Sequence, residues 1–251
     1  MTESPAQITD RIGLTGNALK LIAVLCMLID HIAWAFVPTA SAAGVVMHII
    51  GRITAPVMCF MLTEGYRYTS NFKGYVRRLA IFAVISWLPF ILFLEGGLPD
   101  SSALLNLNMM YSLMLALLAL WVDNHMDGFD RLLALGVLCF LSLFGDWPVM
   151  AILYTLNFAR NRENKKRMIS LFIIISTVFT LYSIWSGLVN GASIPYLFAA
   201  SLPQMGTILA LPLIGLYNGK KGGRTGGKWF FYWFYPVHLL LLALLRMIVN
   251  F

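Results

Sequence analysis

The sequence predicts an all-α protein: a polytopic transmembrane helix bundle of about nine segments with one short broken-helix hairpin. Three observations support this fold class. The 251 residues are 59% hydrophobic and only 12% charged, and the mean hydropathy is +0.78, values typical of polytopic membrane proteins. Long apolar runs recur along the whole chain. The Lys and Arg residues gather in short loops between these runs, as membrane topology requires.

The first apolar run covers residues 20–37 and follows a polar stretch, residues 1–17, which we expect to form a cytosolic N-terminal tail. Residues 18–251 then form one transmembrane domain. A cleaved signal peptide is not favoured, because the run is too long and Asp30 and His31 interrupt it. The later segments are expected at residues 44–66, 79–94, 104–122, 131–144, 149–159, 169–189, 196–217 and 229–249.

The fifth and sixth of these segments are each too short to cross a bilayer comfortably. They are separated by residues 145–148, Gly-Asp-Trp-Pro. Such a break at membrane depth is tolerated where it is buried or lines a cavity. Asp146 is therefore a candidate site residue. An ordinary external hairpin between two tilted helices explains the pattern equally well.

The charges of the loops predict the orientation. Basic residues follow the second, sixth and eighth segments; they are Arg67, Lys73, Arg77, Arg78, Arg160, Arg162, Lys165, Lys166, Arg167, Lys220, Lys221, Arg224 and Lys228. These loops fall on one side, which the positive-inside rule makes cytoplasmic, although the loop at residues 123–130 on that side is acidic. We therefore expect a multi-pass protein of the bacterial cytoplasmic (inner) membrane with its N-terminus inside. The net charge of +7 then reflects topology and membrane lipids, not nucleic-acid binding.

The first segment carries the strongest functional signal. Asp30 and His31 lie deep inside it, and an ionisable pair at that depth costs several kcal/mol on insertion scales. Eleven positions separate Lys20 from His31, which places both on one helix stripe, about 16 Å apart along the axis. Neighbouring side chains diverge by about 100°, so Asp30 is expected to hold Arg52 or a residue of another helix. A core histidine bonded to a backbone carbonyl is the alternative for His31.

Two further polar residues are expected at the depth of His31. Arg52 lies twelve residues, about 18 Å, from Glu64 at the inner end of its segment, and His238 lies ten residues, about 15 Å, past Lys228. Polar side chains in lipid face the bundle interior or a wet cavity, so this convergence predicts a shared site. Arg52 could instead only neutralise Asp30. His238 follows Tyr235 by one turn and could belong to a hydrogen-bonded aromatic belt.

The basic residues at the cytoplasmic ends of these helices suit a phosphate-bearing cosubstrate. We expect Lys20, Arg77, Arg78 and Lys228 to bind it, although such residues are more often topology signals alone. The three cysteines show no CxxC pattern, so neither a disulfide framework nor a metal site is predicted. Glycine-rich nucleotide loops and the common hydrolase motifs are also absent from the sequence.

Several motifs carry a family resemblance: Lys-Leu-Ile and Asp-His within residues 19–31, Gly-Arg, Pro and Glu-Gly within 51–65, and residues 75–82, 217–220 and 235–240. In these motifs the chain resembles the TraX family of F-pilin N-acetyltransferase-like membrane proteins. A fainter similarity to the acyltransferase-3 membrane family rests on Lys20 and His31 in the first helix, a basic residue and a histidine with ten positions between them. Arg77-Arg78 and the late Tyr-x-x-His at Tyr235 and His238 add to it.

These resemblances imply acyl transfer from cytosolic acetyl-CoA, or another acyl-CoA, to a peptide, glycan or lipid acceptor. His31 would act as base or carry the acyl group, Arg52 would stabilise the oxyanion and Asp30 would orient them. His238 and Asp146 complete the expected catalytic site, and Tyr235 joins the residues expected to bind the cosubstrate. The alternatives are a transporter or proton-coupled carrier, which intramembrane His, Arg and Asp also suit, and a pilus-assembly scaffold with a structural polar core.

Overall fold

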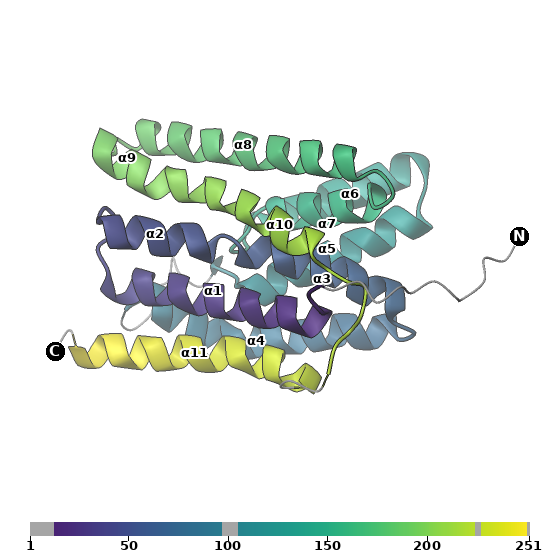
Figure 1. Ribbon diagram of the computed structural model, residues 1–251, viewed down its shortest axis with the longest axis horizontal. Coiled ribbons are helices and arrows are strands. Elements are labelled where there is room, and N and C mark those ends of the chain that lie inside the picture. The colour runs from purple at the N-terminus through teal and green to yellow at the C-terminus, as the bar shows by residue number, and fades with distance from the viewer. Residues whose placement is uncertain (1–12, 97–104, 224–226, 250–251) are drawn as a thin grey trace, which may run out of the picture.

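The computed structural model describes residues 13–96, 105–223 and 227–249, and their regular secondary structure is helical. Figure 1 shows the helices lying side by side along one direction. Their bounds are α1 (Gly16–Phe36), α2 (Ala42–Gly51), α3 (Thr54–Tyr68), α4 (Phe72–Glu95), α5 (Met109–His125), α6 (Gly128–Ser142), α7 (Met150–Arg160), α8 (Lys165–Val189), α9 (Ile194–Ser201), the 3-10 helix η2 (Leu202–Leu209), α10 (Ala210–Gly215) and α11 (Gly227–Val249). The predicted all-α bundle is confirmed.

Six stretches of the described chain are long and apolar enough to cross a membrane. They are Gly16–Phe36, Ala42–Tyr68, Phe72–Glu95, Lys165–Val189, Ile194–Gly215 and Trp229–Val249. Helices α5, α6 and α7 are shorter, with 17, 15 and 11 residues. The count of nine crossing segments therefore stays a prediction. Of the expected N-terminal tail, residues 1–12 lie outside the described part, and the first helix begins at Gly16.

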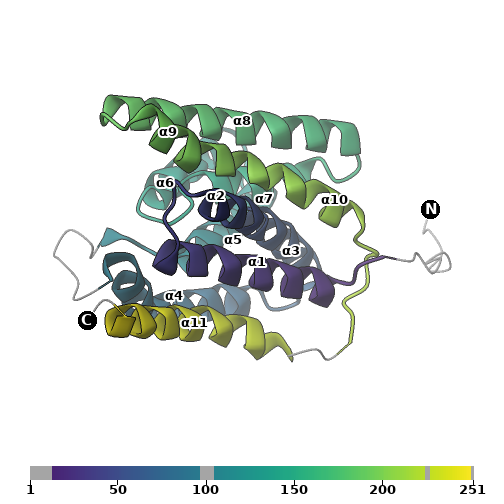
Figure 2. The same ribbon diagram turned by 60° about the vertical axis from the view of Figure 1, so that its left-hand side comes forward.

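Helix α1 is covered by other helices on part of its surface, while Leu25 and Trp34 on it are exposed. It packs against α2 and α3 on one side and against α11 on another. Figure 2 shows α1 between a tier formed by α4 and α11 and a tier formed by α8, α9 and α10. Its first turn is fixed by Thr15, whose side chain accepts the N–H of Ala18, and by the hydrogen bond from Gly16 N–H to the carbonyl of Lys220. Polar groups on α1 thus face protein on several sides.

The second predicted segment, residues 44–66, lies within the single apolar stretch Ala42–Tyr68, but the helix in that stretch is interrupted. It breaks at Arg52 and Ile53, between α2 and α3. Pro56 explains the break, because proline has no N–H to donate to the carbonyl four residues earlier and its ring clashes with that carbonyl. The carbonyl in question belongs to Arg52. The break therefore places Arg52 at a helix end.

The predicted broken hairpin is present. Helix α6 ends at Ser142 and α7 begins at Met150. Val149, a β-branched residue, has φ 60° in the turn between them, a backbone conformation that such residues rarely adopt. The Val149 N–H donates to the Ser142 hydroxyl at 2.9 Å. This strained turn carries Asp146 and Trp147.

The described basic loops lie at one end of the bundle, which we call the basic end. It is the end at which α1 begins and α3, α7 and α10 finish (Figure 1). The Glu64–Arg162 ion pair (N···O 2.6 Å) joins α3 to the α7–α8 connection there. The far end, where α1 and α4 finish, carries Arg246 in the last turn of α11. The structure confirms that the basic loops gather together; which end faces the cytoplasm stays a prediction.

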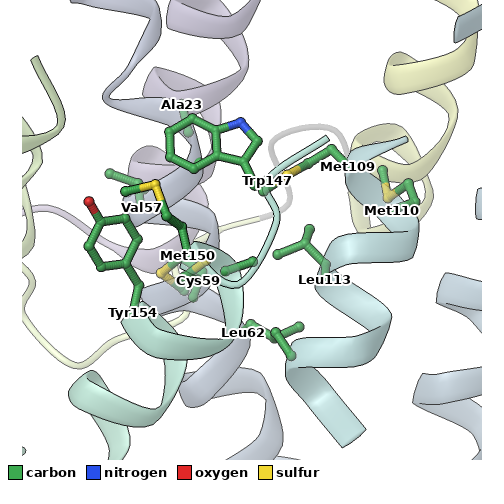
Figure 3. Close-up of a cluster of buried hydrophobic side chains, with 14 of the residues drawn as sticks. Ala23, Val57, Cys59, Leu62, Met109, Met110, Leu113, Trp147, Met150 and Tyr154 are labelled. Carbon is green, nitrogen blue, oxygen red and sulfur yellow. The ribbon is translucent and has the colours of Figure 1, made fainter. Parts of the chain in front are cut away.

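The apolar core surrounds α5 and α7. Figure 3 shows the Trp147 ring among side chains from four helices, including Ala23, Val57, Met109 and Met150. Trp147 and Met109 also line the cavity described below, so the core forms part of its wall.

Candidate functional site

A cavity of about 520 Å³ lies within the bundle, a volume in the range of small-molecule sites. Residues of α1, α2, α3, α4, α5, α11, η2 and the two breaks line it. Its ionisable lining residues are Asp30, His31, Arg52, Asp146, Tyr235 and Arg246. The described α1 residues of the lining begin at Met27, so the cavity belongs to the half of α1 away from the basic end.

His31 and His238 form a direct pair. His31 Nδ1 lies 2.7 Å from His238 Nε2, although 207 positions separate the two residues. The His238 Nδ1–H also donates to the carbonyl of Phe234, one turn earlier on α11, at 2.7 Å. His238 is buried, while His31 is partly exposed and lines the cavity. The alternative of His31 bonded only to a backbone carbonyl is therefore not what the structure shows.

Asp30 forms a second pair, on the opposite flank of α1. Its Oδ1 lies 2.7 Å from His48 Nδ1 of α2, and both side chains are buried. The close approach of the two helices depends on Gly51, because a Cβ at that position would collide with the Asp30 side chain. The partner of Asp30 is thus a residue of another helix, one of the two predicted possibilities. The hydrogen bond goes to His48 and not to Arg52.

Arg52 occupies the break between α2 and α3 and lines the same cavity. Its guanidinium carbon lies 5.8 Å from the centre of the Trp147 ring, within the range of a cation–π contact. The Arg52 Nε is buried and has no hydrogen-bond partner among the described residues. The guanidinium is therefore held against an aromatic face with part of its donor capacity unused.

Asp146 enters the cavity lining from the strained turn between α6 and α7. The residue is exposed while its neighbour Trp147 is buried. Within the described part of the chain, no ion pair involves the Asp146 carboxylate, whereas Asp30, Glu64 and Asp123 each have a basic partner. The turn is thus no plain external hairpin: it contributes an accessible carboxylate to the cavity wall.

The expected cosubstrate residues divide into two groups. Tyr235 lines the cavity, and its hydroxyl accepts the N–H of Met109 at 3.2 Å. Lys20, Arg77 and Arg78 do not line it. The Lys20 Nζ instead lies 5.7 Å from the centre of the Phe231 ring. The side chain of Lys228 lies outside the described part.

The remaining basic side chains have local partners near the basic end. Arg77 lines a hollow of about 190 Å³ with Asn71, Lys73 and Gly74, and the Arg78 guanidinium carbon lies 5.4 Å from the centre of the Tyr75 ring. The Glu64 carboxylate pairs with Arg162 in this region. Burial and this carboxylate raise the pKa of nearby Tyr217 to about 12. The basic end and the cavity are therefore two separate polar regions.

Two residues of the site were not assigned a role from the sequence. His48 shares a helix face with Arg52 at a spacing of four, which was the available signal. Arg246 donates Nη1–H to the carbonyl of Phe93 at 3.2 Å and lines the cavity.

No group of three or more His, Cys, Asp or Glu side chains in the described ranges could hold a metal ion.

Comparison with known proteins identifies the family. The profile described as "TraX protein" matches residues 15–246. The chain belongs to the TraX family. It is also 32% identical over 240 residues to the "Probable fimbrial assembly protein FimC, serogroup H1" of Dichelobacter nodosus, covering 92% of this chain and 96% of that protein. No solved structure matches the chain significantly.

The TraX match spans every element that contributes to the cavity, from α1 to Arg246 in the last turn of α11. The cavity is therefore part of the family domain itself and not of an added segment.

Proposed function

We propose that this TraX-family protein is an integral membrane acyltransferase. It would move an acetyl or other acyl group from cytosolic acyl-CoA to an amine or hydroxyl acceptor, such as the N-terminus of a pilin-like protein. One observation carries the proposal: His31, paired with His238, shares a cavity inside an apolar bundle with Arg52. Ionisable residues in such a bundle usually mark function, because they are costly there. The link of the family to F-pilin acetylation supports the same activity.

The chemistry follows from this arrangement. The nitrogen or oxygen of the acceptor attacks the thioester carbonyl carbon, and His31 takes the proton that the acceptor loses. The carbonyl oxygen becomes an oxyanion, which the unused donor capacity of Arg52 would stabilise. The carbon–sulfur bond then breaks, and the CoA thiolate takes the proton back from His31. No redox partner or metal is needed for this balance.

The route of the acyl donor is part of the proposal. Two contacts join α1 to α11. Lys20 lies over the Phe231 ring near the basic end, and His31 pairs with His238 further from that end. Seven residues, about 10 Å, separate Lys20 from Met27, the first described α1 residue of the cavity wall. We propose that the nucleotide phosphates bind at the basic end and that α1 and α11 part to admit the pantetheine arm. The basic end would then face the cytoplasm.

The test uses purified protein in detergent with labelled acetyl-CoA and a peptide carrying a free N-terminus. We expect CoA release in the wild type and a loss of about 10²–10⁴-fold in His31→Ala, the usual contribution of a general base. His125→Gln, at the exposed last residue of α5, is the control and should retain full turnover. Equal turnover in His31→Ala and the control would remove His31 from the mechanism.

Arg52 provides a second, independent test. Arg52→Gln removes the positive charge beside Trp147, and we expect kcat to fall by about 10²–10³-fold, as for the loss of an oxyanion donor. Arg52→Lys retains the charge and should recover part of the loss. An unchanged kcat in Arg52→Gln would refute the role in oxyanion stabilisation.

A pilus-assembly scaffold is the second candidate, because the D. nodosus relative carries the printed name of a fimbrial assembly protein. A scaffold has no reason to bind CoA. Calorimetric titration of CoA into the purified protein therefore separates the two functions: binding favours the acyltransferase, and its absence at millimolar CoA favours the scaffold.

A further inference from the structure

His238 holds its proton on a defined nitrogen. Its Nδ1 lies 2.7 Å from the carbonyl oxygen of Phe234, and a carbonyl oxygen only accepts hydrogen bonds. Nδ1 must therefore carry the hydrogen. In a neutral imidazole the other nitrogen then has a lone pair, so His238 Nε2 is an acceptor.

This acceptor faces His31. The two ring centroids are 5.0 Å apart and the ring planes differ by 14°. The centroid separation is close to the sum of the 2.7 Å N···N distance and the two ring radii, so the rings meet edge to edge, nearly in one plane. This is the geometry of a straight N–H···N hydrogen bond and not of face-to-face stacking. His31 Nδ1 must donate, because His238 Nε2 cannot.

The surroundings favour a neutral pair. Phe93 packs against the His31 ring and Phe234 against the His238 ring. The adjacent carboxylate of Asp30 is bonded to His48 on the other flank of α1. Arg52, Asp146 and Tyr235 line the cavity that His31 faces. Since the only proton of a neutral His31 is on Nδ1, its Nε2 carries a lone pair, and no described residue forms a hydrogen bond with it.

We propose that His238 is the positioning residue that fixes His31 in the Nδ1–H tautomer and thereby presents Nε2 of His31 as the base. The tautomer follows from the hydrogen bonds alone. Its catalytic meaning rests on the proposed acyltransferase function. His31 Nδ1 donates to His238 Nε2, and His238 Nδ1 donates to the carbonyl of Phe234. The proton that His31 gains from the acyl acceptor therefore stays on Nε2 of His31 until the thiolate takes it.

Nitrogen NMR of protein labelled with ¹⁵N-histidine tests the tautomer directly. The sequence contains four histidines, and the His31 signals are assigned by their loss in His31→Gln. We expect a protonated Nδ1 and an unprotonated Nε2 for His31, and the same for His238. A protonated Nε2 on a neutral His31 would overturn the proposal, whether or not the protein shows acyltransferase activity.

Two substitutions at His238 test the positioning role. His238→Gln places an amide oxygen, an acceptor, near the position of Nε2, whereas His238→Leu offers no acceptor. We expect the His31 tautomer to persist in the Gln variant and to become mixed in the Leu variant. Turnover should fall about 10²-fold in Leu and less than about tenfold in Gln, because a base in the wrong tautomer loses most of its contribution.

The outcomes separate the two claims. Equal turnover in both folded His238 variants, with the expected tautomer in the wild type, would overturn the positioning role. If the wild type transfers no acyl group at all, the proposed function fails while the NMR result still decides the tautomer. Thermal unfolding of each variant shows whether a loss of turnover reflects a loss of fold.

Discussion

Replacing Gly51 by Ala tests the packing on which the site depends. A Cβ at Gly51 would overlap the Cβ, Cγ and Oδ1 of Asp30. Asp30 has little room to move, because it is buried and its Oδ1 lies 2.7 Å from His48 Nδ1. Overpacking of this kind costs about 1–3 kcal/mol. If the side chains separate, the buried Asp30 carboxylate loses its hydrogen-bond partner, which adds about 1–3 kcal/mol.

A matched control makes this prediction sharp. Gly136 lies inside α6, and a Cβ there meets no atom within 4 Å. Gly136→Ala makes the same chemical change and should stabilise the protein by up to about 1 kcal/mol, since alanine favours the helix. Thermal unfolding in detergent, followed by tryptophan fluorescence, compares the two. At about 2–4 °C per kcal/mol, Tm should fall by at least about 2 °C in Gly51→Ala and not fall in Gly136→Ala. Equal Tm values for the two variants would refute the close packing of Asp30 on α2.

Two further predictions concern the basic end. Arg162→Ala leaves the Glu64 carboxylate, 4% exposed, without its partner, and because Arg162 is itself 42% exposed we expect a loss of about 1–3 kcal/mol, read as a lower Tm. Adding Glu64→Gln should restore part of that loss, and a further drop would show that the carboxylate was not the cause. An alkaline phosphatase fused after Ala192, at the far end of the bundle, should be active in cells, whereas a fusion after Glu163 should be inactive; the reverse pattern would invert the orientation.

The depth of the polar residues could be predicted from the sequence. A helix rises 1.5 Å per residue, so counting from the charged end of each segment gives the axial position of His31, Arg52 and His238. The structure brings His31 into contact with His238 and places Arg52 in the same cavity. The count says nothing about rotation around each helix axis. The partners of Asp30 and His31 could therefore not be chosen from the sequence.

The break between α2 and α3 shows a different limit of prediction from the sequence. Its cause, Pro56, is visible in the sequence, but the apolar run continues across it and predicts one long segment. Whether a proline bends or divides a helix depends on what fills the gap. Here Arg52 occupies the break and its guanidinium lies over Trp147 of the other break. That contact joins segments far apart in sequence, and only the folded bundle reveals it.

The two histidine pairs on α1 suggest why a neutral partner orients His31. Consecutive residues of a helix point about 100° apart, so Asp30 is directed to His48 on α2 and His31 to His238 on α11. A carboxylate beside His31 would bring a charge into an apolar bundle and would need its own counter-charge, at a cost that often exceeds the attraction. His238 fixes the orientation and the tautomer of the ring without adding charge. We therefore expect that an aspartate in His238→Asp does not replace the function of His238. Even if His31 still donated from Nδ1, the uncompensated carboxylate would hold His31 in its protonated form after His31 accepts the proton. The return of that proton to the departing thiolate would then slow.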